Sequence, residues 1–278
     1  GPYDFEAFRC RTWSSATNKP PILPYRGVAR TGVCFATELV LDAIAREAGK
    51  EPHEVRLMNL PSADAMPFDN ITAKHFDSGD YPTCFKKAVE AIDVASVRER
   101  QKTPEPDGRK IGVGLSIFCE QGAHGTTVYA GWGIPMVPGH EQCGARLTPD
   151  GELELRIGAH SHGQGLETTL AQVAHEILGI DPGLVRLVHG DTGVTPYSTG
   201  TWGSRCMVMS GGAVATACEA LAERAKCIGA SLLQTEQADV RVEAGNVVSP
   251  NNSISLRDIA KVWYLKPQDL PGDVDPAG

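Results

Sequence analysis

Two glycine-rich loops hold the residues with the greatest potential for chemistry. The first spans residues 158–165 (GAHSHGQG) and the second reaches residues 200–205 (GTWGSR). In the first loop, the amide of Gln164 can both donate and accept hydrogen bonds, and the glycines on either side of it allow close approach to the backbone. Tight turns explain either loop alone equally well. Two such loops in one domain, each leading into a helix, predict a large anionic ligand, because the first N–H groups of a helix have no backbone partner.

The elements that must position these loops follow from apolar spacing. Residues Leu166, Leu170, Val173, Ile177 and Leu178 fall on one helical face, and Gly179 suits a helix end, so a helix is predicted over 166–178. A strand is predicted over 184–188, before the second loop. A second helix is predicted to open at residues 210–212 and to bury an apolar face that runs to residue 228.

A hairpin is predicted immediately before the first loop. Strands over 145–147 and 152–157 flank the turn 148–151 (TPDG), in which proline second and glycine fourth suit a type I turn. Leu153, Leu155 and Ile157 alternate with polar residues, which indicates one buried face and one solvated face. The hairpin therefore delivers the chain directly into the first loop. Further along, a second hairpin is predicted around residues 244–246, and Ser255 is predicted to start a helix.

The N-terminal part has a different character. Residues 1–33 contain several prolines, and their pattern is extended rather than helical until Arg30; they include the loop Tyr25-Arg26-Gly27. An amphipathic helix is predicted over 34–48, with Phe35, Leu39, Val40, Ala43, Ile44 and Ala48 packed in the core. Helices are also predicted to open at Pro52 and Pro82. The stretch 103–108 (TPEPDG) interrupts all periodicity, so a boundary is placed between domains 1–105 and 106–278. Together the segments predict an α+β fold of two mixed α/β domains.

Three motifs carry a resemblance to a known family. The stretches 162–169 (HGQGLETT), 200–205 (GTWGSR) and 25–27 (YRG), in this order and at these separations, resemble the molybdopterin-binding subunit of the xanthine dehydrogenase and aldehyde oxidase family. The resemblance covers nearly the whole chain. It implies that 1–105 is a first molybdopterin-binding segment and that 106–278 is a second molybdopterin-binding domain.

The resemblance also implies roles for particular residues. Gln164 is similar to the glutamine that hydrogen-bonds the metal's oxo ligand in this family. The cofactor-binding set implied by the three motifs is Tyr25, Arg26, Gly27, Gly163, Gln164, Gly165, Trp202, Gly203, Ser204 and Cys206. A dithiolene of the cofactor holds the metal in this family, so no protein metal ligand is expected. No catalytic residue is expected in this chain either, because the family's general base is a glutamate after a glycine in a later segment, and the only Gly-Glu pair here is Gly151-Glu152, in the predicted turn.

The expected cofactor is molybdenum-molybdopterin, with the cytosine dinucleotide as one form, and iron–sulfur and FAD centres are expected on other domains or subunits. The implied activity is oxidation of an aldehyde or an N-heterocycle, such as a xanthine-like ring, with oxygen from water. The chain is expected to be an inactive fragment without the remaining part of the molybdopterin subunit. Two departures stand out: residues 29–32 read ARTG where the family has GRPE, and Gly27 replaces the cysteine of the carbon monoxide dehydrogenase branch, so that substrate is not expected.

Two other functions remain open on the residues alone. His160 and His162 project the same way from an extended segment, as the metal pair of a metal-dependent hydrolase would. A non-catalytic ligand-binding domain is the second alternative. Stoichiometric zinc without pterin would favour the hydrolase, and cofactor binding without turnover would favour the binding domain.

Composition narrows the classes of partner. The 278 residues carry a net charge of −8, and no basic cluster stands out, which argues against nucleic-acid binding and favours a small-molecule substrate. No two of the eight cysteines are spaced as C-x-x-C, so a zinc or iron–sulfur site on cysteines is not predicted. No apolar run approaches the ~18 residues that span a membrane. A cytoplasmic protein with reduced thiols is therefore expected.

Overall fold

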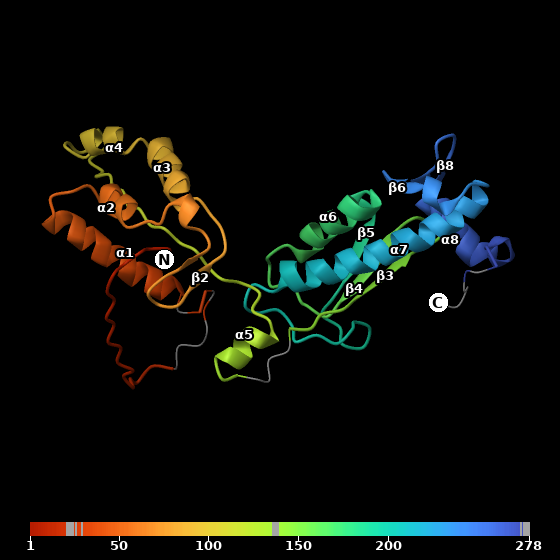
Figure 1. The fold of residues 1–278 in the computed structure, drawn as a ribbon, viewed down its shortest axis with the longest axis horizontal. Coiled ribbons are helices and arrows are strands. Elements are labelled where there is room, and N and C mark those ends of the chain that lie inside the picture. Colours follow the sequence, from red (N-terminus) through yellow and green to blue (C-terminus); the bar gives the residue numbers. More distant parts are fainter. Residues whose placement is uncertain (21–24, 26, 29, 135–138, 273, 275–278) are drawn as a thin grey trace. The chain divides into compact units, whose positions relative to one another are not determined.

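The computed structural model describes all residues except 21–24, 26, 29, 135–138, 273 and 275–278, and it divides into two compact units, Gly1–Glu120 and Gln121–Gly278 (Figure 1). The division lies after Glu120, whereas the sequence places a boundary at 105/106. Ile117 explains the difference, because it is buried in the core of the first unit together with Tyr3 and Leu41. The chain thus returns to the first core after the proline-rich stretch and before it enters the second unit.

Helices dominate the first unit. They are α1 (Arg30–Glu47), α2 (Pro52–Met58), α3 (Tyr81–Ile92) and α4 (Val94–Arg100), with a short hairpin of β1 (Phe68–Asp69) and β2 (His75–Phe76) and a 3-10 turn at Ala63–Ala65. The predicted helices at Pro52 and Pro82 are confirmed, with each proline in the first turn. Asp80 and Asp93 cap α3 and α4, because their carboxylates accept hydrogen bonds from the amides of Thr83 and Ser96.

The face that α1 buries is opposite to the predicted one. The expected core residues Phe35, Leu39, Val40 and Ile44 are 48–67% exposed, whereas Leu41, Ala45 and the acidic Glu38 are buried. The reason is Arg56, whose side chain is fully buried and requires a carboxylate partner. An unpaired buried charge costs more than the about 1.5–3 kcal/mol that burial of one apolar side chain contributes. The placement of the apolar face of α1 in the core was therefore wrong.

A buried polar cluster links α1, α2 and the N-terminal segment. The Arg56 Nε donates to Glu38 Oε2 at 2.7 Å, and its Nη1 lies 2.9 Å from Asp42 Oδ1. The Tyr3 hydroxyl donates to Glu38 Oε1 at 2.8 Å. Burial and this hydrogen bond raise the pKa of Tyr3 far above its ordinary value, so the phenol stays protonated and remains a donor. Glu38 thus holds together three segments of the first core.

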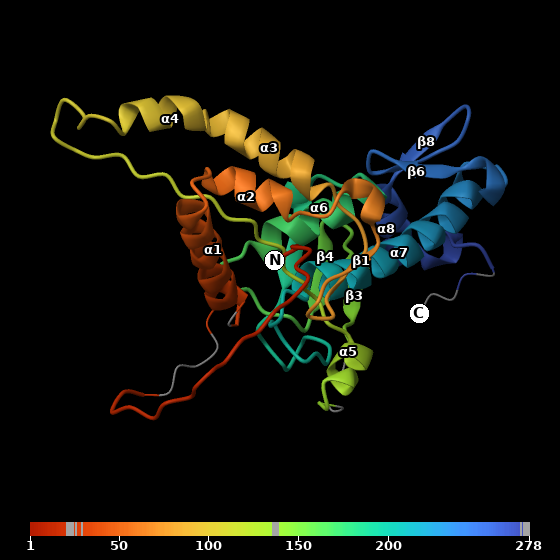
Figure 2. The same cartoon turned by 60° about the vertical axis from the view of Figure 1, so that its left-hand side comes forward.

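The second unit contains the sheet that carries the glycine loops. Strands β3 (Cys143–Leu147), β4 (Leu153–Ile157) and β5 (Val185–Val188) pair in that order, with β3 antiparallel and β5 parallel to β4. Helices α6 (Leu166–Leu178) and α7 (Gly211–Leu232) lie side by side over one face of this sheet (Figures 1 and 2). The predicted hairpin, the helix over 166–178 and the following strand are confirmed, and Gly179 ends α6 in the left-handed conformation.

The two faces of the sheet differ as the alternation predicts, with one exception. Leu153, Leu155 and Ile157 are fully buried against α6 and α7. Glu154, on the other face, is also buried, because Arg146, Arg156 and Arg186 surround its carboxylate at 3.2, 2.8 and 3.7 Å. Although burial disfavours the charged form, the hydrogen bond from Arg156 and the three positive charges lower the pKa of Glu154 below its usual value.

The remaining elements of the second unit frame this sheet. They are α5 (Thr126–Gly131), a π-helical turn (Cys206–Ser210), a small sheet of β6 (Arg241–Glu243), β7 (Asn246–Val248) and β8 (Ser253–Ser255), α8 (Leu256–Leu265), and 3-10 turns at Pro182–Leu184, Gln237–Asp239 and Pro267–Asp269. The predicted second hairpin and the Ser255 cap are confirmed: Ser255 accepts from the Asp258 amide. Within the described part of the chain, no helix is long and apolar enough to cross a membrane.

Replacement of Arg56 by Ala tests the buried cluster. We expect this variant to lower the free energy of unfolding of the first unit by about 3–5 kcal/mol, because it leaves the Glu38 carboxylate buried without its partner. Urea denaturation measures the change. The matched control is Arg98→Ala, which removes a partly exposed pair with Glu51 and should cost less than about 1 kcal/mol. Equal effects of the two substitutions would show that burial of the Arg56 pair does not matter.

Candidate functional site

The two glycine loops meet at one edge of the sheet. The first loop follows β4 and the second follows β5, and because these strands are parallel neighbours their carboxyl ends lie at the same edge. Thr201 joins the loops directly: its Oγ1 accepts from the His160 amide at 2.8 Å and donates to the His160 carbonyl at 2.5 Å. The predicted association of these two motifs in one domain therefore has a physical basis.

Gly158 allows this close approach. A Cβ at this position would lie 2.2 Å from the Ser198 Cβ and 2.6 Å from the Pro196 carbonyl oxygen. Contacts this short cannot be relieved by rotation of a flexible side chain, because one of the atoms is backbone. Only glycine fits where the end of β4 passes the second loop.

The first loop presents Gln164 at the surface. The Gln164 Oε1 accepts a hydrogen bond from the His162 amide, which fixes the orientation of the side-chain amide because the backbone N–H is a donor. The Gln164 NH₂ group is therefore the part of the side chain that can donate to a ligand. Gly163 and Gly165 have φ of +98° and +79°, and a Cβ at either position would have no neighbour within 4 Å. The backbone beside Gln164 is thus open.

The N-terminus of α6 already has an acidic side chain of its own. Glu167 lies in the first turn, and its Oε1 is 2.9 Å from His189 Nε2. The Glu167 carboxylate accepts hydrogen bonds from its own backbone amide and from His189. These bonds, the first more than the second, lower the pKa of Glu167 below its ordinary value. The Glu167 carboxylate therefore partly neutralises the positive end of the α6 dipole. The exposed loop before the helix is the better place for a ligand to bind.

The second loop is a tight turn of left-handed residues. Gly200, Gly203 and Ser204 have φ of +85°, +57° and +58°, an unusual conformation for a serine. The loop leads into the π-helical turn at Cys206, one turn before the helix start that the sequence predicts at residues 210–212. Helical bulges of this kind are frequent at functional sites. The helix therefore continues directly from the loop.

Two of the predicted cofactor-binding residues, Trp202 and Cys206, direct their side chains toward other parts of the protein. The Cys206 thiol is buried and lies 3.5 Å from Thr201 Oγ1, so it supports the contact between the loops. The Trp202 indole N–H donates to the Thr199 carbonyl at 3.0 Å, and its ring contacts Tyr129 edge-on at 5.3 Å between centroids. The Ser204 residue is exposed. Trp202 and Cys206 thus shape the loop, whose backbone remains the surface for a ligand.

A third segment, residues 121–125, packs on the second loop. The Ala123 amide donates to the Gly203 carbonyl at 2.8 Å, and a Cβ on Gly122 would lie 2.9 Å from the Ser204 Cβ. The sequence shows several glycines and aromatic residues between 121 and 140 but no periodicity, so it did not identify these contacts. The signal that could have found them is Gly122, which close packing requires.

The Tyr25-Arg26-Gly27 motif belongs to the first unit. Tyr25 is exposed, the Val28 amide donates to its carbonyl at 2.7 Å, and Gly27 has φ of +90°. Arg26 lies outside the described residues. Tyr25, Gly27 and Val28 therefore take part in a tight turn before α1.

The histidine pair does not make a metal centre with its neighbours. His160 Nδ1 lies 3.2 Å from His189 Nδ1, and His189 is in turn bonded to Glu167, so His160 takes part in a hydrogen-bonded chain. The His160 and His162 ring centroids are 5.7 Å apart. Among the described residues, no three histidine, cysteine or acidic side chains are arranged to hold a metal ion. The structure therefore adds no third ligand to the hydrolase hypothesis.

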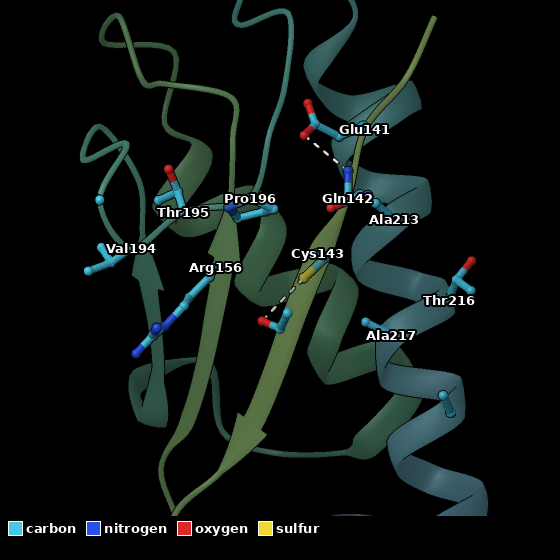
Figure 3. Close-up of a pocket in the computed structure, with 13 residues that line it drawn as sticks. Glu141, Gln142, Cys143, Arg156, Val194, Thr195, Pro196, Ala213, Thr216 and Ala217 are labelled. Atoms are coloured by element: carbon cyan, nitrogen blue, oxygen red, sulfur yellow. Dashed lines mark hydrogen bonds between the residues drawn. The ribbon is translucent and has the colours of Figure 1, made fainter. Parts of the chain in front are cut away.

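An open cavity of about 830 Å³ lies beside β3, and Gln164 is not among the residues that line it. Figure 3 shows it between α7, which contributes Ala213, Thr216 and Ala217, and the loop of residues 193–196. Burial raises the pKa of its thiol, Cys143, to about 12, which disfavours the thiolate form. The two loops offer open backbone at Gly163 and Gly165, so their meeting point is the better candidate site.

Comparison with known proteins shows the family of the chain. Family profiles described as molybdopterin cofactor-binding domains match residues 1–60 and 87–274. The chain belongs to the molybdopterin-binding family of xanthine dehydrogenase and aldehyde oxidase. The α+β fold that the sequence predicts is that of this family.

Two curated relatives and one solved structure illustrate the similarity. The gamma subunit of the 6-hydroxypseudooxynicotine dehydrogenase complex of Paenarthrobacter nicotinovorans is 34% identical over 94% of this chain and 32% of its own length. The carbon monoxide dehydrogenase large chain of Hydrogenophaga pseudoflava is 28% identical over 99% of this chain and 35% of its own. Quinoline 2-oxidoreductase from Pseudomonas putida 86 matches with a TM-score of 0.79 and 29% identity, over 91% of this chain and 32% of that chain. The molybdopterin-binding chain therefore spans about a third of these relatives.

The residues at the loops fit a molybdopterin. Gly163, Gly165 and Gly200 leave open space where side chains would stand, and each has a positive φ that favours glycine. Beside them, the Gln164 NH₂ group can donate to an oxygen of a bound group. An extended anionic ligand could therefore lie along both loops without displacing a side chain.

Removal of the Thr201 hydroxyl tests the link between the loops. We expect Thr201→Val to lower the free energy of unfolding of the second unit by about 1–2 kcal/mol and to speed hydrogen exchange at the His160 amide, because it removes both hydrogen bonds to that residue. Urea denaturation and exchange mass spectrometry measure these effects. Thr201→Ser keeps the hydroxyl and serves as the control. Wild-type behaviour of Thr201→Val would mean that the loops are held by other contacts.

Proposed function

We propose that this chain is the cofactor-binding part of a molybdenum hydroxylase that oxidises an aldehyde or an N-heterocycle with oxygen from water. The observation that carries the proposal is the bonding of the two glycine loops through Thr201 and His160, with open backbone at Gly163 and Gly165. When bound, the molybdenum-molybdopterin supplies the redox centre. The protein's part is to bind this group, orient it and donate hydrogen bonds to it.

Each predicted site residue has a role in this proposal. Gln164 would donate from its NH₂ group to an oxygen of the bound cofactor, since its own side-chain oxygen is already bonded to the His162 amide. The backbones of Gly163, Gly165, Trp202, Gly203, Ser204 and Cys206 line the cofactor in the second unit. Tyr25, Arg26 and Gly27 are also proposed as pterin contacts, because the planar guanidinium of Arg26 would suit the polar edge of the pterin.

An organic substrate is favoured over carbon monoxide. Some relatives are named for nicotine derivatives or quinoline, which contain nitrogen rings, while others are named for carbon monoxide. Gly27, which replaces the cysteine of the carbon monoxide branch, has φ of +90°, and a Cβ there would lie 2.8 Å from Thr31 Cγ2. A cysteine would be strained in this turn. This geometry supports an aldehyde or N-heterocycle as substrate.

The proposed enzyme needs further parts. The cofactor is proposed as a molybdopterin, with the cytosine dinucleotide as the form to test first. Iron–sulfur and flavin centres on other domains or subunits receive the electrons, and the remaining part of the molybdopterin subunit completes the site in a cytoplasmic assembly. The relative from Paenarthrobacter nicotinovorans, a subunit of a dehydrogenase complex, supports a multi-subunit arrangement.

Substitution of Gln164 tests its role. In the complete enzyme we expect Gln164→Ala to lower kcat by at least about 100-fold, because it removes a preorganised donor at the reacting centre, while the fold is unchanged since the side chain is exposed. Steady-state kinetics with matched molybdenum content measure the effect. Gln172→Ala, on the exposed surface of α6, is the control. A wild-type rate with wild-type molybdenum content in Gln164→Ala would reject the assignment.

The chain by itself is expected to be inactive and poor in cofactor. Glu152, in the only Gly-Glu pair, is exposed in the hairpin turn, so it is not placed to act as a base beside the loops. Pterin and molybdenum assays, with dye reduction by a panel of aldehydes and purines, test this expectation against the complete large subunit. Robust turnover by residues 1–278 would show that the base lies within them.

A further inference from the structure

A buried ion pair lies directly beneath the second glycine loop. Glu141 Oε2 and Arg205 Nη1 are 3.1 Å apart, and both side chains are only 2% exposed. We infer that this pair is a positioning clamp that holds residues 200–205 in the conformation that binds the cofactor, before the cofactor arrives. The inference deepens the proposed function and rests on the assignment of this loop to cofactor binding.

Arg205 fastens the loop at both of its ends. It is the last residue of the loop, and its Nη1 donates to the carbonyl of Gly200, the first residue, at 2.7 Å. Its Nη2 donates to the His140 carbonyl at 2.5 Å, which ties the loop to the segment before β3. The guanidinium also lies 5.7 Å from the centroid of the Trp202 ring. One side chain thus closes the loop on itself and anchors it to the segment that leads into β3.

Glu141 organises the elements on either side of the loop. Its Oε2 accepts from Ser198 Oγ at 2.8 Å, just before the loop, and from Ser210 Oγ at 3.3 Å, at the end of the π-helical turn after it. Ser198 Oγ in turn accepts from the Gly200 amide at 3.0 Å. Figure 3 shows Glu141 where the chain enters β3, next to Ala213 of α7. One carboxylate therefore connects the start of the loop, its end and the entry to β3.

The loop needs such a clamp because its backbone conformation is unfavourable without other contacts. Gly200, Gly203 and Ser204 all have positive φ, and the loop makes no ladder hydrogen bonds of a sheet and no regular helix. Without fixed contacts, a glycine-rich segment loses much conformational entropy on ordering. A clamp that orders the loop in advance removes this cost from binding. Neither charged group reaches the ligand-facing surface, so both act through the loop.

Hydrogen exchange on the complete large subunit tests the clamp in the cofactor-free form, obtained from a host that cannot make molybdopterin. We expect Glu141→Gln and Arg205→Lys to speed exchange of amides 200–205 by about tenfold or more, with exchange in α6 and β4 unchanged. Ser198→Ala is a milder variant that removes one contact of Glu141 and one of Gly200, and it keeps the test decisive if the charged variants fold poorly. Arg241→Lys, in an exposed pair with Glu243, is the control.

The same variants are then produced with cofactor. We expect pterin content per subunit to fall about tenfold at limiting cofactor supply, and the Mo(V) EPR spectrum of the remainder to broaden, effects that a change in global stability alone does not produce. Unchanged loop exchange, or acceleration that is equal across the second unit, would overturn the clamp. Faster loop exchange with wild-type pterin content and EPR spectrum would leave the clamp standing and would instead contradict the assignment of this loop to the cofactor.

Discussion

The parallel pairing of β4 with β5 is the constraint on which the candidate site depends. It forces the chain to leave both strands at one edge of the sheet, so that loops far apart in sequence emerge as neighbours. Everything else at the site refines this placement: Gly158 lets the loops touch, Thr201 bonds them, and Gln164 stands on the first of them. The fully buried leucines of β4 lock the sheet against α6 and α7 and so keep the edge in place.

Local patterns allowed much of this unit to be predicted. The helix over 166–178, the hairpin before the first loop and the Ser255 cap depend on apolar period or on turn and capping residues within a few positions. The glycine motifs indicated the candidate site for the same reason, since both loops are short and continuous in sequence. All of these elements are determined by residues that are close together along the chain.

Long-range contacts explain what could not be predicted. The apolar face of α1 is a strong local signal, but Arg56 on another helix brings Glu38 inward and reverses it. Glu141 gives no signal in the sequence, because its meaning depends on two serines and an arginine more than fifty positions away. The segment 121–125 has no periodicity, and only its contact with Gly203 gives it a place at the site. Charge pairing and close backbone packing across such separations are decided by tertiary structure.

The inverted face of α1 has a practical consequence for handling the protein. Four large apolar side chains of α1 are exposed to water: Phe35, Leu39, Val40 and Ile44. Such a surface associates with other apolar surfaces, and the extent of association rises with protein concentration. The chain of residues 1–278 should therefore be studied at low concentration and checked for self-association by light scattering. We expect mild detergent to weaken this self-association and added salt to strengthen it. We therefore expect self-association through this face of α1 to be the first property to control in work on the isolated chain.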